Sequence, residues 1–229
     1  MKLFLSMVLG VVLLASQAGA EEKKALQTPK EKQSYSMGAD IGVRLKSQSI
    51  EVDADAFIQG MKDALSGGKM LLTEQEIRET LAAMQKELTE KQAERAKMLG
   101  EKNKKEGEAF LAENKKKEGV ITLPSGLQYK VIKEGTGKTP GPNDTVVCNY
   151  RGTLVDGTEF DSSYKRGEPA TFPVKGVIPG WVEVLQLMKE GSKLQVFVPS
   201  NLAYGERGAG SAIGPNATLI FEIDLVSVK

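Results

Sequence analysis

The possible folds are constrained most by a change in residue type near residue 119. Residues 21–118 hold 38 charged residues but only one of the 9 prolines and three aromatic residues. Residues 119–229 hold 22 charged residues, 8 prolines, 15 of the 24 glycines and nine aromatic residues. A charged segment with few turn residues favours helices, whereas a segment interrupted by Gly and Pro and rich in aromatics favours strands. The sequence therefore predicts a helical region that ends at 118 and a β-rich domain over 119–229.

The first 20 residues have the pattern of a cleavable signal peptide. Lys2 precedes a mainly apolar run from Leu3 to Ala15, and Ala18-Gly19-Ala20 supplies small residues for cleavage after Ala20. The run is shorter than the ~20 apolar residues that a membrane-spanning helix needs. We therefore expect an exported protein that begins near residue 21.

Residues 21–72 predict two short helices with unburied apolar faces. Met37, Ile41 and Leu45 recur every four residues and indicate a helix over 34–46. Asp53 is a suitable N-cap for a second helix, which we expect to end at Gly67-Gly68. Two such helices cannot bury their apolar sides by themselves. They need the rest of the chain or a second copy of it.

Residues 73–118 predict one long connecting helix. Thr73 and Glu76 have the spacing of a capping box, and charged pairs four residues apart support a solvated helix. A continuous helix over 73–117 would be about 65–70 Å long. Gly100 and Gly107 weaken it locally and are the expected points of bending. The segment is interpreted as a solvated spacer.

Residues 119–229 predict an α+β domain with an antiparallel sheet. In the last segment Leu219, Phe221, Ile223 and Leu225 alternate with a second set of residues, as in a sheet with one face on a core. A single short helix is expected over 181–188. Strands are expected over 127–133, 145–154, 159–162, 170–175, 193–199 and 217–228.

The absence of histidine excludes several classes of active site. Without His there is no Ser-His-Asp triad, no imidazole acid or base and no His-ligated zinc. Cys148 is the single cysteine, so it cannot form an internal disulfide, and we expect a buried structural thiol. A net charge of +1 gives no reason to expect nucleic acid as a partner. No metal or other cofactor is expected.

Five short motifs follow one another in order in residues 119–229. They are Asn149-Tyr150-Arg151-Gly152, Gly157-Thr158-Glu159-Phe160-Asp161-Ser162-Ser163, Val177-Ile178-Pro179-Gly180-Trp181, Ala203-Tyr204-Gly205 and Ala217-Thr218-Leu219-Ile220-Phe221-Glu222. Such an ordered set is more specific than any single short pattern. It resembles the FKBP family of peptidyl-prolyl isomerases. The N-terminal signal, the segment Tyr35-Ser36-Met37-Gly38 and the long helix further resemble the Mip-type subgroup of that family.

The resemblance implies a fold, an activity and a set of site residues. The fold would be a half-wrapped antiparallel sheet around one short helix, preceded by an all-α dimerisation domain over 21–72 and the connecting helix. The activity would be prolyl cis/trans isomerisation, with Asp161 and Tyr204 as catalytic residues and Trp181 as the pocket floor. The other implied substrate-binding residues are Tyr150, Phe160, Phe172, Val177, Ile178, Ile213 and Phe221.

The resemblance also implies partners and a location. They are proline-containing peptides and unfolded exported proteins, a second copy bound through residues 21–90, and macrolide inhibitors, whose affinity depends on the small residues Ala170 and Ala209. The expected location is the periplasm, with association with the outer membrane left open. Two alternatives stay open: a mainly non-enzymatic chaperone, and a protein displayed at the surface on the 73–117 helix.

Overall fold

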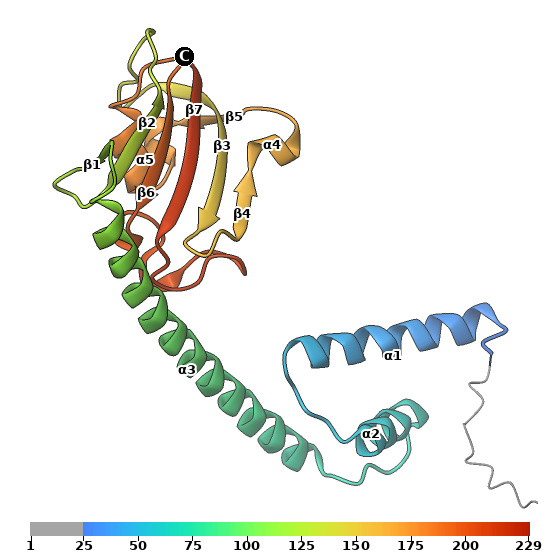
Figure 1. Cartoon of the computed structure of the whole chain (residues 1–229). Helices are drawn as coiled ribbons and strands as arrows, with labels where there is room; N and C mark the ends of the chain where they lie inside the picture. The colour runs from blue at the N-terminus through green and yellow to red at the C-terminus, as the bar shows by residue number, and fades with distance from the viewer. Residues whose placement is uncertain (1–24) are drawn as a thin grey trace, which may run out of the picture. The chain divides into compact units, whose positions relative to one another are not determined.

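The computed structural model describes residues 25–229, which divide after Thr73 into two compact parts. The predicted signal peptide over 1–20 lies outside the described residues. Figure 1 shows helices α1 and α2 in the first part, and helix α3 with the β-sheet in the second. In residues 25–229, no helix is both long and apolar enough to cross a bilayer.

Helix α1 spans Pro29–Ser47 and begins five residues before the expected start. The Thr28 hydroxyl accepts a hydrogen bond from the Glu31 N–H at 3.1 Å, and the Glu31 carboxylate accepts the Thr28 N–H at 2.9 Å. This capping box, with Pro29 in the first turn, starts the helix two turns before Met37, the first apolar residue of the predicted repeat.

Helix α2 spans Ala54–Ser66 and has the expected ends. The Asp53 carboxylate accepts the Ala56 N–H at 2.9 Å, and Gly67 takes the left-handed conformation at φ 65°. No residue between 25 and 73 is buried. The apolar sides of both helices are therefore still unburied in the isolated chain.

Helix α3 spans Glu74–Asn114 without a break, and the expected bending at Gly100 and Gly107 stays a prediction. Both glycines are buried because the helix packs there against the sheet domain. A side chain on Gly107 would overlap the Thr218 hydroxyl, and one on Gly100 would meet the Pro215 Cβ at 3.2 Å. These glycines therefore permit close packing of α3 against the sheet domain.

The last part of α3 also corrects the interpretation of this segment as a solvated spacer. The Phe110 ring lies 5.8 Å from the Phe197 ring, and the buried Asn114 side chain donates to the Gln128 side chain at 3.0 Å. Gln128 in turn donates to the Leu111 carbonyl at 2.9 Å. The segment before this contact is exposed and charged, as expected.

The sheet is antiparallel throughout and follows the order β1-β2-β6-β7-β3-β4, with β5 also paired to β3. The expected strands are present with small shifts at their ends. β1 was missed because three residues are too few to show a repeating pattern. The strands are β1 (Val120–Thr122), β2 (Gln128–Lys133), β3 (Thr145–Leu154), β4 (Glu159–Ser162), β5 (Ala170–Pro173), β6 (Lys193–Val198) and β7 (Leu219–Val228).

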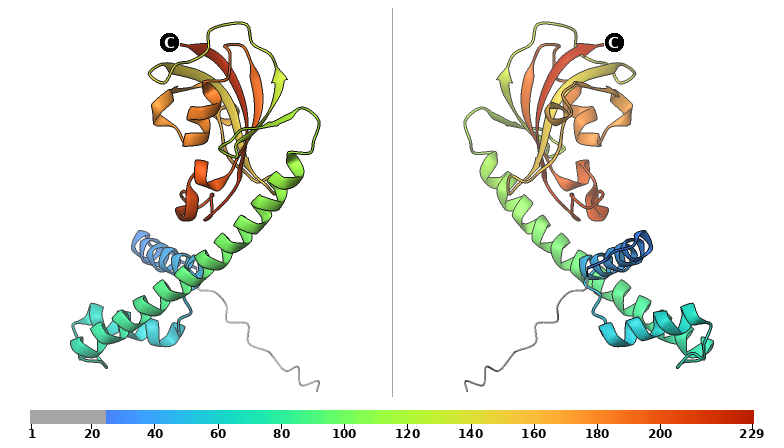
Figure 2. Two further views of the ribbon diagram at one scale, coloured as in Figure 1. Left: turned by 90° about the vertical axis from the view of Figure 1, so that its left-hand side faces the viewer. Right: turned by 90° about the vertical axis from the view of Figure 1, so that its right-hand side faces the viewer.

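The hydrophobic core lies between one face of the curved sheet and helix α5 (Figures 1 and 2). This helix spans Pro179–Leu185, earlier than the expected 181–188, because Pro179 is well suited to its first turn. Buried Leu219, Phe221, Ile223 and Leu225 confirm the alternation read in β7. The short helix α4 spans Ser163–Arg166, and one-turn 3₁₀ segments cover Val174–Gly176, Ser200–Leu202 and Gly205–Arg207.

This α+β arrangement confirms the predicted fold class. The predicted division into 1–20, 21–72, 73–118 and 119–229 stays a prediction, although the packing of α3 joins it physically to the sheet domain. Cys148 is buried on β3, as expected.

Candidate active site

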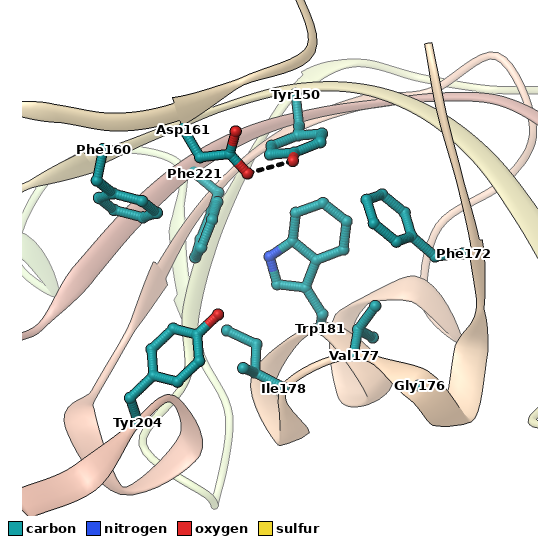
Figure 3. A pocket seen from close by; sticks show the side chains of 10 residues that line it. All are labelled: Tyr150, Phe160, Asp161, Phe172, Gly176, Val177, Ile178, Trp181, Tyr204 and Phe221. Atoms are coloured by element: carbon teal, nitrogen blue, oxygen red, sulfur yellow. Dashed lines mark hydrogen bonds between the residues drawn. The ribbon is translucent and has the colours of Figure 1, made fainter. Parts of the chain in front are cut away.

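A cavity of about 430 Å³ opens between the sheet and the start of α5. Its volume lies within the range of small-ligand sites. Side chains from β3, β4, β5, β7 and α5 surround it, together with the loop that carries Tyr204 (Figure 3). The lining residues are Tyr150, Phe160, Asp161, Phe172, Gly176, Val177, Ile178, Trp181, Tyr204 and Phe221.

Trp181 is the centre of the aromatic wall. Its ring meets Tyr150 at 5.3 Å, Phe172 at 5.6 Å and Phe221 at 5.3 Å between centroids, each nearly edge to face. This is a favoured geometry for aromatic pairs and holds the indole in one orientation. The buried indole N–H has no hydrogen-bond partner among residues 25–229.

Gly152 explains part of the strand motif around Tyr150. A Cβ at this position would lie 2.6 Å from the Phe160 ring and 2.9 Å from the Phe221 ring. Those two rings pack on each other with centroids 5.6 Å apart. Because Gly152 has no side chain, the Phe160 and Phe221 rings can pack against the strand and form one side of the cavity.

The polar side of the cavity is a network of three side chains. The Tyr150 hydroxyl donates a short hydrogen bond to one Asp161 oxygen, and Arg166 donates to the other. Arg166 also donates to the Tyr150 oxygen at 2.8 Å, with its guanidinium carbon 5.4 Å from the centre of that ring. The Ser162 N–H gives Asp161 a further bond at 2.8 Å.

This network controls which groups carry charge. Partial burial acts to raise the pKa of Asp161, but hydrogen bonds from Tyr150 and Arg166 outweigh it, so the pKa lies below its ordinary value. Burial and then the bond to Asp161 raise the pKa of Tyr150. Near neutral pH the carboxylate is therefore ionised and the phenol keeps its proton.

Two further hydrogen-bond donors lie at the cavity. The Tyr204 side chain is 42% exposed, and its hydroxyl points toward the middle of the cavity (Figure 3). Ile178 caps α5, and its carbonyl accepts from the Trp181 and Val182 N–H groups at 2.9 and 3.1 Å. Within residues 25–229 we find no acceptor for the Ile178 N–H.

Nine of the ten predicted site residues line this one cavity, and Ile213 does not. Ile213 is buried in the hydrophobic core, because its backbone pairs with Ala209 and turns the loop back on itself. Arg166 and Gly176 were missed. Nothing in the sequence separates Arg166 from its neighbour Lys165, since both follow the motif around Asp161 on α4.

The fold and this aromatic cavity define an isomerase domain, and comparisons with known proteins agree. One family model, for FKBP-type peptidyl-prolyl cis-trans isomerase, matches residues 136–226. A second, for the domain amino terminal to such isomerases, matches residues 30–131. The chain belongs to the FKBP-type peptidyl-prolyl cis-trans isomerases, and the predicted enzyme class is confirmed.

Within this family the chain is similar to Mip proteins, as the sequence predicted, and also to FkpA proteins. It is 50% identical over 229 residues to an outer membrane protein MIP of Legionella longbeachae, covering 100% of this chain and 98% of the relative. It is 47% identical over 204 residues to a peptidyl-prolyl cis-trans isomerase Mip of Coxiella burnetii, covering 89% of each chain.

A solved structure shows the same likeness in three dimensions. The crystal structure of FkpA from Escherichia coli superposes with a TM-score of 0.69 at 39% identity, covering 90% of this chain and 99% of that one. A peptidyl-prolyl cis-trans isomerase from Pseudomonas syringae gives a TM-score of 0.53 at 40% identity, over 56% of this chain and 95% of that one.

Proposed function

We propose that the chain isomerises X–Pro bonds of exported proteins in the cavity around Trp181 and so assists their folding. The observation that carries this proposal is a cavity with aromatic walls and one hydrogen-bonded polar side. Amide resonance opposes rotation of a peptide bond by ~18–20 kcal/mol. Lowering such a barrier needs no nucleophile, which suits a chain without histidine.

The mechanism we propose is desolvation of the prolyl amide combined with hydrogen bonds that favour its twisted form. Trp181 would form the floor under the proline ring, with Tyr150, Phe172 and Phe221 around it. Removing water from the amide weakens the charge separation on which its resonance depends. Donors that fit the twisted amide better than either planar form then lower the barrier further.

Each polar group has a proposed role. The Ile178 N–H donates to the substrate backbone, and the Tyr204 hydroxyl donates to a substrate carbonyl. Asp161 is the polar wall beside the twisting carbonyl, held in place by Tyr150 and Arg166. Its pairing with these two groups offsets the free-energy cost of placing a charge beside an apolar cavity.

The experiment is an isomerisation assay on short X–Pro peptides with the full mature chain. Tyr204→Phe and Asp161→Ala should each lower kcat/KM. Tyr164→Phe is the matched control, because Tyr164 is exposed on α4 and does not line the cavity. If the parent chain leaves the rate at the buffer level, the proposal is wrong.

We further propose export to the periplasm as a homodimer. Support for export comes from the signal pattern over 1–20 and from the name of the Legionella relative, an outer membrane protein. Fractionation of the cell envelope tests the location, and separates a periplasmic protein from one held at the outer membrane or displayed at the surface.

The proposed dimer contact lies on the helical part. Helices α1 and α2 line an apolar cavity of about 380 Å³, which includes Gly42 and Phe57. A Cβ added at Gly42 would have no side chain or neighbouring element of the described residues within 4 Å, so this side of α1 is uncovered. Burial of this surface by a second copy would supply the core that two short helices lack.

The alternative function is a mainly non-enzymatic chaperone that holds unfolded chains. The observation in its favour is the apolar surface of the helical part, where Leu65 is 86% exposed and Leu71 is 82% exposed. Exposed apolar surface of this kind binds partners. A substitution in the Trp181 cavity should abolish isomerase activity but should leave a holding function of the helical part intact.

Macrolide inhibitors are proposed as further ligands of the same cavity. Ala170 is half-buried against the core, and Ala209 lies in the loop after Tyr204. Compared with larger side chains, these two alanines offer a bound macrolide fewer contacts at the edge of the cavity. The aromatic floor around Trp181 is unchanged. Addition of a macrolide inhibitor to the isomerisation assay tests this directly.

A further inference from the structure

We propose that helix α3 positions Tyr204 for the reaction by holding the C-terminal end of the loop Gly205–Asn216, which is itself hydrogen-bonded to the beginning of the loop. Asn103 on α3 and Asn216 at the end of the loop are the positioning residues. The inference rests on the proposed role of the Tyr204 hydroxyl. It assigns a task in the isomerase site to a helix that does not line the cavity.

Asn216 connects α3 to the residue that follows Tyr204. Its side chain donates to the Gly100 carbonyl on α3 at 3.4 Å, and its backbone N–H donates to the Gly205 carbonyl at 2.8 Å. Asn216 takes the left-handed conformation at φ 56°, which Asn tolerates better than most residues. One residue thus joins the helix, the end of the loop and its beginning.

Asn103 holds the same end of the loop from the neighbouring turn of α3. Its half-buried side chain donates to the Pro215 carbonyl at 2.8 Å. The loop lies close to the helix here, since a Cβ on Gly214 would be 3.0 Å from atoms of both Leu99 and Asn103. The contact is therefore both hydrogen-bonded and tightly packed.

Gly107 fixes the distance between α3 and the start of β7. The backbone of this buried glycine lies so close to Thr218 that a side chain would overlap the Thr218 hydroxyl and approach its Cβ to 3.1 Å. Thr218 precedes β7, which carries Phe221 of the cavity. The helix and the cavity wall therefore share one tightly packed contact.

The loop needs such support because its glycines give its backbone many accessible conformations. Gly205, Gly208 and Gly210 all have positive φ values, of 58°, 65° and 56°. Glycines at such angles lose much conformational freedom on ordering, so the loop has a high entropy cost that its anchors must offset. Without the anchors, the Tyr204 hydroxyl would spend less time aimed at the cavity.

The first experiment compares Asn103→Ala with Gln92→Ala in the full chain. Both remove a carboxamide from α3, but Gln92 is exposed and lies two to three turns before the loop contacts. Asn103→Ala should lower kcat for an X–Pro peptide by about three- to tenfold, the effect of losing one hydrogen bond, with little change in KM. Gln92→Ala should match the parent, and the unfolding midpoint of Asn103→Ala should fall modestly while all three proteins stay fully folded at the assay temperature.

The decisive measurement repeats Asn103→Ala in a Tyr204→Phe background. If α3 acts through the Tyr204 hydroxyl, Asn103→Ala has almost no further effect once that hydroxyl is gone. Equal effects in both backgrounds overturn the inference. If Tyr204→Phe alone leaves kcat unchanged, the proposed role of Tyr204 fails as well, and the two failures are distinguishable.

A second pair of variants tests the packing contact without removing a hydrogen bond from α3. Gly107→Ala should lower kcat because the new methyl group pushes the helix away from Thr218. Adding Thr218→Ala removes the overlapping hydroxyl and should restore most of the loss. Gly107→Ala with parental kcat, or a loss that Thr218→Ala does not reduce, would count against positioning by α3.

Discussion

The Tyr150 hydroxyl donates a hydrogen bond to the Asp161 carboxylate on the polar side of a cavity with aromatic walls. Tyr150 uses the same ring to pack edge to face on Trp181, so one side chain connects the polar and the aromatic walls. Any change in the charge of Asp161 should therefore affect the aromatic wall as well. This connection underlies the first two predictions.

Arg166→Ala is predicted to lower kcat/KM for X–Pro peptides several-fold at neutral pH. Removal of the guanidinium takes hydrogen bonds from both Asp161 and Tyr150 and leaves the carboxylate less well held. Lys165→Ala is the control on the same helix, since its amine pairs with Glu159 at 2.9 Å instead. Equal losses in the two variants would contradict a specific role for Arg166.

Isomerase activity is predicted to vary little between about pH 6 and about pH 8, because no imidazole titrates there. The pKa of Asp161 is lowered, so the folded state binds its proton less readily than the unfolded chain does. Its contribution to stability is thus present above the unfolded value of about 3.9 and is lost as the pH falls through the folded pKa. A pH–rate profile and unfolding midpoints against pH measure both effects.

Phe57→Glu is predicted to convert the dimer to a monomer in light scattering of residues 21–229. The substitution places a charge in the apolar cavity between α1 and α2, where a second copy would have to bury it. Gln59→Glu is the matched control, because it adds the same charge on α2 outside that cavity. A parent chain that is already monomeric would rule out the dimer.

The double variant Asp161→Ala, Tyr204→Phe is predicted to lose acceleration of refolding that is limited by proline isomerisation. Both changes remove polar groups of the cavity and leave the apolar surface of residues 25–73 unchanged. Suppression of aggregation by the same variant should be measured in parallel. If the variant loses this acceleration but suppresses aggregation as well as the parent does, holding of clients is independent of isomerisation. Retained acceleration would contradict the roles proposed for Asp161 and Tyr204.

Cys148 is predicted to resist alkylation in the folded protein. Burial, with the nearby charge of Asp224, raises the pKa of the thiol to about 12, so almost no thiolate is present at mildly alkaline pH. Titration of the thiol with and without denaturant checks this. Rapid reaction in the native state would show that this part of β3 opens.

Features that depend on local pattern could be predicted from the sequence. The alternation in β7, the Asp53 cap and the motif residues around Trp181 each involve residues close together in the chain, and the structure has them as expected. The aromatic cavity could be anticipated because the five motifs occur in family order. The family fold that this order implies brings the five motifs together in space.

Features that depend on distant contacts could not be predicted. Gly107 looks like a weak point in a helix until Thr218, more than a hundred residues later, is seen against it. Ile213 lies between two motifs, yet its pairing with Ala209 turns it into the core. Arg166 and Lys165 are adjacent cations on α4, and only the folded chain shows that Arg166 bonds Asp161 and Tyr150 while Lys165 pairs with Glu159.

Trp181 is the only tryptophan in the chain, and it lies in the wall of the cavity. The intrinsic fluorescence of the whole protein therefore originates, apart from five tyrosines, at one point in direct view of a bound ligand. An indole packed against three aromatic rings, with no hydrogen-bond partner within residues 25–229, is sensitive to any molecule that displaces water beside it. Trp181 fluorescence should therefore report binding in the cavity, so peptides or inhibitors can be titrated without a label.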